Sequence, residues 1–254
     1  MKGVVLAGGL GTRLHPLTKV TNKHLLPVYD RPMIYYPFEC LKNAGVDEVL
    51  LVTGGSSCGE FMRLLGDGRV FGLRSITYAY QEGEEGIADA LRLAEPFAAG
   101  GPVLVVLGDN IIEQNVLASA EAFERQGGGA RIILKEVDDP ERFGVPVMEG
   151  DKITSIVEKP DSPASNLAVI GIYFYDHRVF DFIRSLEPSR RGEYEISDVN
   201  NEYARRGLLQ YDVLGGWWTD AGTFESLYRA NELVHRTGAN KLNRPSVRPS
   251  GEPT

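Results

Sequence analysis

Short apolar runs alternate with segments of helical periodicity through the first 140 residues of the chain. Buried strands are predicted at 3–7, 48–53, 75–80, 102–107 and 130–137, and helices at 34–43, 58–65, 87–97 and 115–126. Such alternation is typical of a parallel sheet covered by helices. We therefore expect an α/β fold with a Rossmann-like, doubly wound, mixed but mostly parallel sheet.

The pattern changes after residue 143, where strands alternate polar and apolar residues and helices are fewer. A hairpin is predicted around Gly150, because GVPVMEG and KITSIVEKP are extended segments joined by a turn. Further elements are predicted as a strand at 168–175, an extended segment at 209–214, a WWTDAG loop, and helices at 177–185, 195–206 and 224–236. This pattern indicates one domain over residues 1–237, divided near residue 140, and a Pro/Ser-rich tail at 238–254 that we expect to be disordered.

Composition excludes several classes of function. The net charge of −8 over 254 residues argues against nucleic acid as a bulk partner. No run of about 18 apolar residues is present, so we expect no membrane span. With no secretory signal pattern and only two cysteines, which form neither a metal motif nor a disulfide framework, we expect a cytoplasmic protein.

The N-terminal region is basic although the protein is acidic. Residues 1–36 hold five Lys and Arg residues against one acid, Asp30. The region is either a solvated basic face or a funnel for a small polyanion, and the glycine-rich turn inside it favours the funnel.

That turn, LAGGLGTR, follows a predicted buried strand. A strand that leads into a glycine turn is how α/β proteins hold nucleotide phosphates, because glycine lets backbone N–H groups approach phosphate oxygens. Leu14 stands where the dinucleotide fingerprint has its third glycine, and the order of a P-loop is also absent. Arg13 adds a forked donor for phosphate, and Lys23 follows ten residues later. A plain tight turn is the alternative.

Two aspartates are candidate magnesium ligands. Asp109 follows a strongly apolar strand at the carboxyl edge of the predicted sheet, where ligands of doubly wound folds bind. Asp220 lies in the WWTDAG segment. Mg²⁺ prefers one or two carboxylates together with phosphate oxygens. The alternative is that each aspartate only caps a helix or stabilises a turn. Trp217 and Trp218 either offer an aromatic plane to a sugar ring or pack on the core.

Two basic residues later in the chain could hold a sugar phosphate. Lys159 follows Glu158 at the end of a strand, and Arg191 lies in a predicted loop. A surface charge pair is the alternative for Glu158 and Lys159. The four histidines show no metal-ligand spacing, and no nucleophilic triad is present.

Together, the motifs LAGGLGTRLHPLT, NKHLLPV, LGDNI, DDPERFGV, VEKP, GIYFYD, RGEYEISDVN and WWTDAGT resemble the sugar-phosphate nucleotidyltransferases, in particular the short members that use dTTP and glucose 1-phosphate. The resemblance covers residues 1 to about 235. It implies transfer of a thymidylyl group to glucose 1-phosphate in dTDP-sugar synthesis, with Mg²⁺ as cofactor and a homo-oligomeric protein. Residues 1–140 would then bind the nucleotide, and residues 141–237 the sugar phosphate.

The resemblance also implies roles for individual residues. Arg13, Lys23, Asp109, Lys159 and Asp220 would be catalytic, and Asp109 and Asp220 would hold the metal ion. The nucleotide site would comprise Leu6, Gly8, Gly9, Gly11, Thr12, Arg13, Gln81 and Gly86. The sugar-phosphate site would comprise Gly144, Glu158, Lys159, Val169, Tyr173, Arg191 and Trp218.

Three features depart from longer members of the family. His24 replaces a glutamine, the loop before Asp220 is shorter, and the sequence stops soon after its last predicted helix, so we expect no regulatory site of the kind that a C-terminal extension builds. Alternatives are the same reaction with UTP, CTP or another hexose phosphate, and a non-catalytic subunit. A nicotinamide-dependent enzyme is disfavoured by Leu14.

Overall fold

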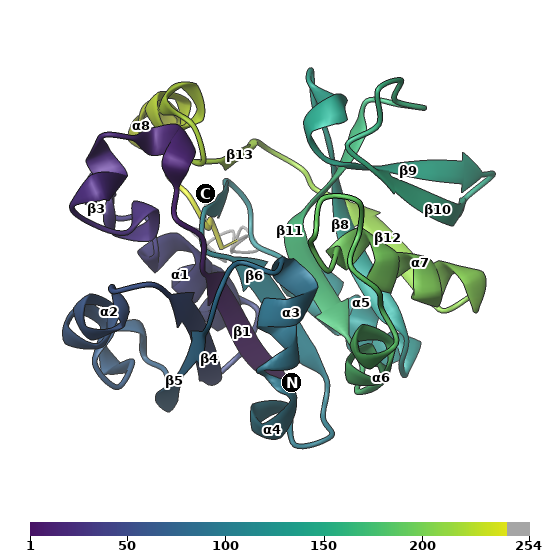
Figure 1. Ribbon diagram of the computed structural model, residues 1–254, viewed down its shortest axis with the longest axis horizontal. Helices are drawn as coiled ribbons and strands as arrows, with labels where there is room; N and C mark the ends of the chain where they lie inside the picture. The colour runs from purple at the N-terminus through teal and green to yellow at the C-terminus, as the bar shows by residue number, and fades with distance from the viewer. Residues whose placement is uncertain (243–254) are drawn as a thin grey trace, which may run out of the picture.

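The computed structural model describes residues 1–242, which form a large mixed sheet covered by helices (Figure 1). The main sheet comprises β1 (Lys2–Ala7), β4 (Glu48–Gly54), β5 (Ser75–Gln81), β6 (Val103–Leu107), β8 (Ala130–Glu136), β9 (Gly144–Glu149), β10 (Lys152–Glu158), β11 (Leu167–Tyr175) and β12 (Leu209–Val213). Two small pairs are β2 (Pro27–Val28) with β3 (Arg31–Pro32), and β7 (Asn110–Ile112) with β13 (Trp218–Asp220). The helices are α1 (Tyr35–Asn43), α2 (Cys58–Leu65), α3 (Ile87–Arg92), α4 (Glu95–Ala98), α5 (Leu117–Gln126), α6 (Arg178–Arg184), α7 (Ile196–Arg205) and α8 (Phe224–Thr237).

The sheet has a parallel part and an antiparallel part. Strands β5, β4, β1 and β6 are parallel neighbours in that order. Strand β11 then pairs antiparallel with β6 and, on its other side, with β8 and β9, while β10 pairs with β9 at the edge. The hairpin β9–β10 lies at the opposite end of the molecule from α2 (Figure 1). The expected α/β architecture is confirmed.

Alternate residues of the central strands supply two cores. Val4 and Leu6 of β1 face a cluster formed with α3, α4, α6 and α7. Val5 and Ala7 face a second cluster formed with α1, α2 and α5. The strand is apolar on both faces because helices cover both faces.

Two predicted elements differ from the structure. The helix predicted at 87–97 is split into α3 and α4, because Pro96 lies at the start of α4 and cannot donate a backbone hydrogen bond to the preceding turn. The WWTDAG segment is not a loop throughout, since Trp218–Asp220 form β13. Thr223 caps α8 with a capping box, whereas Ser57 precedes α2 without a side-chain cap bond.

The first residues of the predicted tail are ordered. The side-chain Nδ2 of Asn240 donates to the carbonyl of Tyr36 at 2.9 Å. The backbone N–H of Asn240 donates to the carbonyl of Ile112 at 2.9 Å. Lys241 lies 2.6 Å from Glu113. Residues 238–242 therefore pack against α1 and β7, and the rest of the predicted tail lies outside the described residues. Within residues 1–242, none of the helices combines the length and the apolar character that crossing a bilayer requires.

Candidate active site

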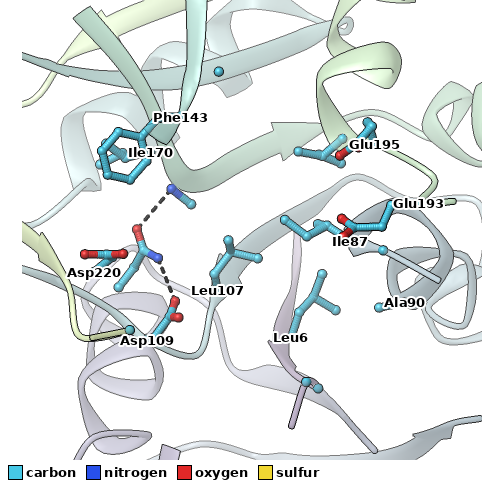
Figure 2. A pocket seen from close by; sticks show the side chains of 18 of the residues that line it. Leu6, Ile87, Ala90, Leu107, Asp109, Phe143, Ile170, Glu193, Glu195 and Asp220 are labelled. Atoms are coloured by element: carbon cyan, nitrogen blue, oxygen red, sulfur yellow. Dashed lines mark hydrogen bonds between the residues drawn. The ribbon is translucent and has the colours of Figure 1, made fainter. Parts of the chain in front are cut away.

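A cleft of about 520 Å³ opens where the parallel strands end. It lies between the glycine-rich turn, α3, β11 and β13, and Figure 2 shows Asp109, Asp220 and Phe143 at one end, with Glu193 and Glu195 at the other. The predicted site residues that line it are Leu6, Gly8, Gly9, Gly11, Thr12, Arg13, Lys23, Gln81, Gly86, Asp109, Gly144, Glu158, Lys159, Val169, Tyr173, Trp218 and Asp220. The structure thus brings together residues from both halves of the chain.

The glycine-rich turn leaves β1 and turns sharply at Gly11. Gly11 has φ 63°, a left-handed conformation that favours glycine, and a Cβ there would lie 3.1 Å from the Lys23 side chain. Leu14 is fully buried, which explains why an apolar side chain stands at this position. The carboxylate of Glu84 accepts the N–H of Leu10 at the tip of the turn. A backbone amide of this turn therefore donates to a carboxylate oxygen, and binding of phosphate by the turn stays a prediction.

Arg13 is exposed and forms no ion pair with any acid in residues 1–242. Its guanidinium lies beside the turn after Asp220, since a Cβ on Gly222 would lie 3.4 Å from Arg13 Nη2. The charge of Arg13 is thus available in the cleft next to the two predicted metal ligands.

Lys23 and Asp109 form a close ion pair, with Nζ 2.6 Å from Oδ2 and both side chains mostly buried. Burial alone would raise the pKa of Asp109, but the Lys23 ammonium outweighs it and holds that pKa well below its usual range. Asn110 donates to the other oxygen of Asp109 at 3.0 Å. Asp109 is therefore ionised and fixed in position.

His24 has a packing role that the sequence did not reveal. Its ring is 1 % exposed and lies against Gly108, where a Cβ would be 2.7 Å from His24 Cδ2. Nδ1 donates to Asn22 Oδ1 at 2.7 Å, because that oxygen also accepts the His24 N–H. Burial, and then the charge of Lys23, lower the pKa of His24 to about 3. A neutral His24 thus anchors the turn that carries Lys23.

Pairing of β7 with β13 brings Asp220 to Asp109. Asp220 is the register partner of Asn110, and the N–H of Ala221 donates to the carbonyl of Asp109 at 2.9 Å. The two carboxylates lie at the same end of the cleft in Figure 2. Burial, followed by the charge of Asp109, raises the pKa of Asp220. Arg142 opposes this rise and lies 3.1 Å from Asp220.

The other half of the cleft is formed by β9, β10 and β11. Glu158 accepts from the hydroxyl of Ser197 at 2.5 Å, and a Cβ on Gly144 would lie 3.0 Å from that hydroxyl oxygen. Lys159 has φ 44°, which is strained for a residue with a side chain, and its N–H donates to the carbonyl of Phe143 at 2.9 Å. The side chain of Lys159 is 46 % exposed and lies beside Glu158. Such a held but solvent-facing cation is suited to a substrate phosphate.

Two predicted residues of this half have surroundings that the sequence did not indicate. The guanidinium of Arg191 pairs with Glu193 at 2.8 Å, Glu195 at 3.7 Å and Glu158 at 3.8 Å, so it borders the cleft beside Glu158. Trp218 does not present an exposed plane, since it is 8 % exposed and packs edge-on against Phe143. Its Nε1 donates to Asn110 Oδ1 at 2.7 Å.

Sequence reasoning assigned no role to several residues of the cleft. Arg142 lies in the quoted DDPERFGV motif, and it neutralises Asp139 and Asp220. Asn110 follows Asp109 directly, and it ties β7, β11 and β13 together by accepting from the N–H of Gly171 at 3.0 Å. Arg142 and Asn110 both lie in motifs that the sequence displays, but only the structure shows their contacts.

A family model described as nucleotidyl transferase matches residues 2–237. The chain belongs to the nucleotidyl transferase family. A glucose-1-phosphate thymidylyltransferase from Neisseria meningitidis is 47 % identical to it over 238 residues, which are 92 % of this chain and 82 % of the relative. One from Mycolicibacterium smegmatis is 46 % identical with the same coverage. This nucleotidyl transferase also superposes on a crystal structure assigned as a glucose-1-phosphate thymidylyltransferase from Bacillus anthracis, which was obtained in complex with sucrose. The TM-score is 0.89 and the sequence identity is 50 %, and the superposition covers 93 % of this chain and 96 % of that one.

Proposed function

We propose that this nucleotidyl transferase converts dTTP and glucose 1-phosphate to dTDP-glucose and pyrophosphate, the first step of dTDP-sugar synthesis. The observation that carries the proposal is that one cleft combines the glycine turn with the cations of Arg13 and Lys23 and the carboxylates of Asp109 and Asp220. The same cleft holds the fixed side-chain amide of Gln81. The named activity of relatives 46–47 % identical to this chain supports the same reaction.

The reaction needs positioning and charge compensation rather than a strong base. A phosphate oxygen of glucose 1-phosphate forms a bond to the α-phosphorus of dTTP, and the bond from that phosphorus to the bridging oxygen of the β-phosphate breaks. The nucleophile is already an anion, so no proton is transferred. Bringing two polyanions together is the main barrier that such a site lowers.

Arg13 and Lys23 would bind the triphosphate and neutralise the departing pyrophosphate. The ammonium of Lys23 has three N–H donors, of which the contact with Asp109 occupies one. The two others remain for phosphate oxygens. Arg13 forms no ion pair among residues 1–242, so the N–H donors of its guanidinium remain for phosphate oxygens.

Lys159 would orient the attacking phosphate, and Glu158 would bind sugar hydroxyls. Arg191 is paired with Glu158, Glu193 and Glu195, so we assign it the neutralisation of these carboxylates at the edge of the cleft. Val169 and Tyr173 of β11 would form the apolar floor beneath the sugar.

The residues around Asp109 and Asp220 fit Mg²⁺. No set of three or more ligating side chains exists in residues 1–242, which suits a cation that takes one or two carboxylates and completes its shell with phosphate oxygens and water. Asp109 and Asp220 are two mostly buried carboxylates at the same end of the cleft, where a divalent cation would add to the charge compensation that Lys23 and Arg142 already provide. When bound, Mg²⁺ would supply charge neutralisation at the α-phosphate.

The test is pyrophosphate release by the purified protein with dTTP, UTP, dCTP, GTP and ATP, each against several sugar 1-phosphates. We expect the highest kcat/KM for dTTP with glucose 1-phosphate. A higher value for another pair would reassign the substrates within the same chemistry, and no release with any pair would favour a non-catalytic subunit. A homo-oligomer in solution, which light scattering would measure, and a cytoplasmic location stay predictions.

A further inference from the structure

Gln81, at the end of β5, has its side-chain amide held by acceptors on one side. The side chain is 6 % exposed, and its Nε2 donates to Asp89 Oδ2 at 2.9 Å. The carbonyl of Gly86 is a second, longer acceptor at 3.4 Å. Asp89 lies on α3, and neither the sequence motifs nor the reaction described above gives it a role.

These contacts determine which end of the amide faces the cleft. An ionised carboxylate can only accept hydrogen bonds, so the NH₂ group of Gln81 must point to Asp89. The carbonyl oxygen Oε1 then points toward the glycine turn, where a Cβ on Gly8 would lie 2.9 Å from it. The cleft therefore presents a hydrogen-bond acceptor at this position.

Arg92 is the charged partner of Asp89. It donates to the other oxygen, Oδ1, from Nη2 at 2.7 Å and from Nε at 3.2 Å. Asp89 is 6 % exposed, while the Arg92 side chain is 55 % exposed. The pair thus places a buried carboxylate oxygen against Gln81 while its counter-charge remains at the surface.

We propose that Asp89 is a positioning residue that selects the base by fixing the Gln81 amide with its acceptor toward the cleft. The proposal rests on the proposed function and on a direct contact between Gln81, a member of the expected nucleotide site, and the base of the nucleotide. Thymine and uracil carry a hydrogen-bond donor at N3, whereas cytosine has an acceptor there. An acceptor fixed in the cleft favours the first two bases and leaves an unfavourable acceptor–acceptor contact with the third.

The variant Asp89→Asn inverts this geometry. Arg92 holds the oxygen of the new amide, so the NH₂ of that amide faces Gln81 and turns the Gln81 NH₂ toward the cleft. We expect kcat/KM for dTTP to fall about 10- to 100-fold, mainly through KM, and the ratio of dTTP to dCTP to fall by at least about 10-fold. Equilibrium binding of dTTP and dCTP to the same variants should show the same change in ratio.

The double variant Asp89→Asn/Arg92→Met provides a rescue. Without Arg92, the new amide can turn its oxygen to Gln81, so much of the dTTP preference should return. A role that is only structural predicts the opposite, because removing Arg92 as well would add damage. If Asp89→Asn does not fold, Asp89→Ala tests the same point, since it frees the Gln81 amide to rotate and should lower the ratio.

Asp176→Asn is the matched control, because Asp176 is a similarly buried carboxylate paired with an arginine outside the cleft. It should leave the ratio of dTTP to dCTP unchanged. If Gln81→Ala leaves the ratio of dTTP to dCTP unchanged, then Gln81 does not contact the base and that premise is overturned. If Gln81→Ala collapses the ratio and Asp89→Asn preserves it, only the role of Asp89 is overturned.

Discussion

The two halves of the cleft place their functional side chains by different rules. In residues 1–140, Gly8 follows β1, Gln81 closes β5 and Asp109 follows β6, so each lies where a parallel strand ends. In residues 141–237, Tyr173 lies inside β11, and Asp220 reaches the cleft because β13 pairs with β7. A parallel sheet gathers its strand ends at one edge, whereas the antiparallel half depends on register between distant segments.

The arginines at the cleft also differ in how they are compensated. Arg13 forms no ion pair within residues 1–242, whereas Arg142 and Arg191 are each paired with two or more carboxylates. A charge without a partner in the protein is available to a substrate. Substitution of Arg13 should therefore change activity alone, whereas substitution of Arg142 or Arg191 should also disturb the protein.

The largest expected effect tests this difference at Arg13. Arg13→Ala should lower kcat/KM about 10²–10⁴-fold, the order of loss expected for a donor that stabilises transition-state charge. The melting temperature should hardly change, because the residue is exposed and unpaired in residues 1–242. Steady-state kinetics and calorimetry measure the two quantities, with the exposed Arg63 on α2 as the site of a control Arg63→Ala. A rate near that of the wild type would remove Arg13 from catalysis.

Asp220 tests the point at which the two halves meet. Asp220→Asn should raise the Mg²⁺ concentration for half-maximal activity on the order of 10-fold or more, because the amide carries no charge for the cation. A titration of pyrophosphate release with Mg²⁺ measures this value, and Asp161→Asn, at an exposed loop position, is the control. An unchanged titration would exclude Asp220 as a ligand.

The same difference between the halves explains what the sequence could predict. Strand ends and the glycine turn are local features, so the parallel strands, the phosphate turn and Asp109 could be found from short motifs. The contact of Asp220 with Arg142 and that of Arg191 with Glu158 depend on segments that are distant in the sequence, which no local pattern encodes. The burial of Trp218 is similar, since its Nε1 bond to Asn110 spans 108 residues.

Gly171 tests how closely the halves must approach. A Cβ at this position would lie 2.6 Å from Leu107, at the end of β6, and 2.7 Å from Asn110 Nδ2. Gly171 falls in the register shift between β11 and β8. Gly171→Ala should therefore cost roughly 1–3 kcal/mol of unfolding free energy. Gly59→Ala in α2 is the control: a Cβ meets nothing within 4 Å there, and alanine favours the helix. Equal stability of the two variants in urea would show that the close approach is not required.

The smallest expected effect concerns Asp176, at the end of β11, which joins the two halves by accepting the N–H of Gly129 at 2.6 Å and the hydroxyl of Tyr203 at 2.9 Å. Burial opposes ionisation, but Arg178 and these donors outweigh it and lower the pKa of Asp176 below its ordinary 3.8. A lowered pKa adds stability above the unfolded-state pKa, and this stability is lost as the pH falls through the folded-state pKa. Asp176→Asn should therefore lower the free energy of unfolding by about 1 kcal/mol at pH 7, the difference between charged and neutral hydrogen bonds.

Urea unfolding measures this effect as a function of pH. The difference in unfolding free energy between Asp176→Asn and the wild type should shrink below about pH 4, whereas the exposed control Asp181→Asn should differ little from the wild type at any pH. A difference for Asp176→Asn that stays constant from pH 7 to pH 3 would mean that the bond across the halves does not depend on the charge of Asp176.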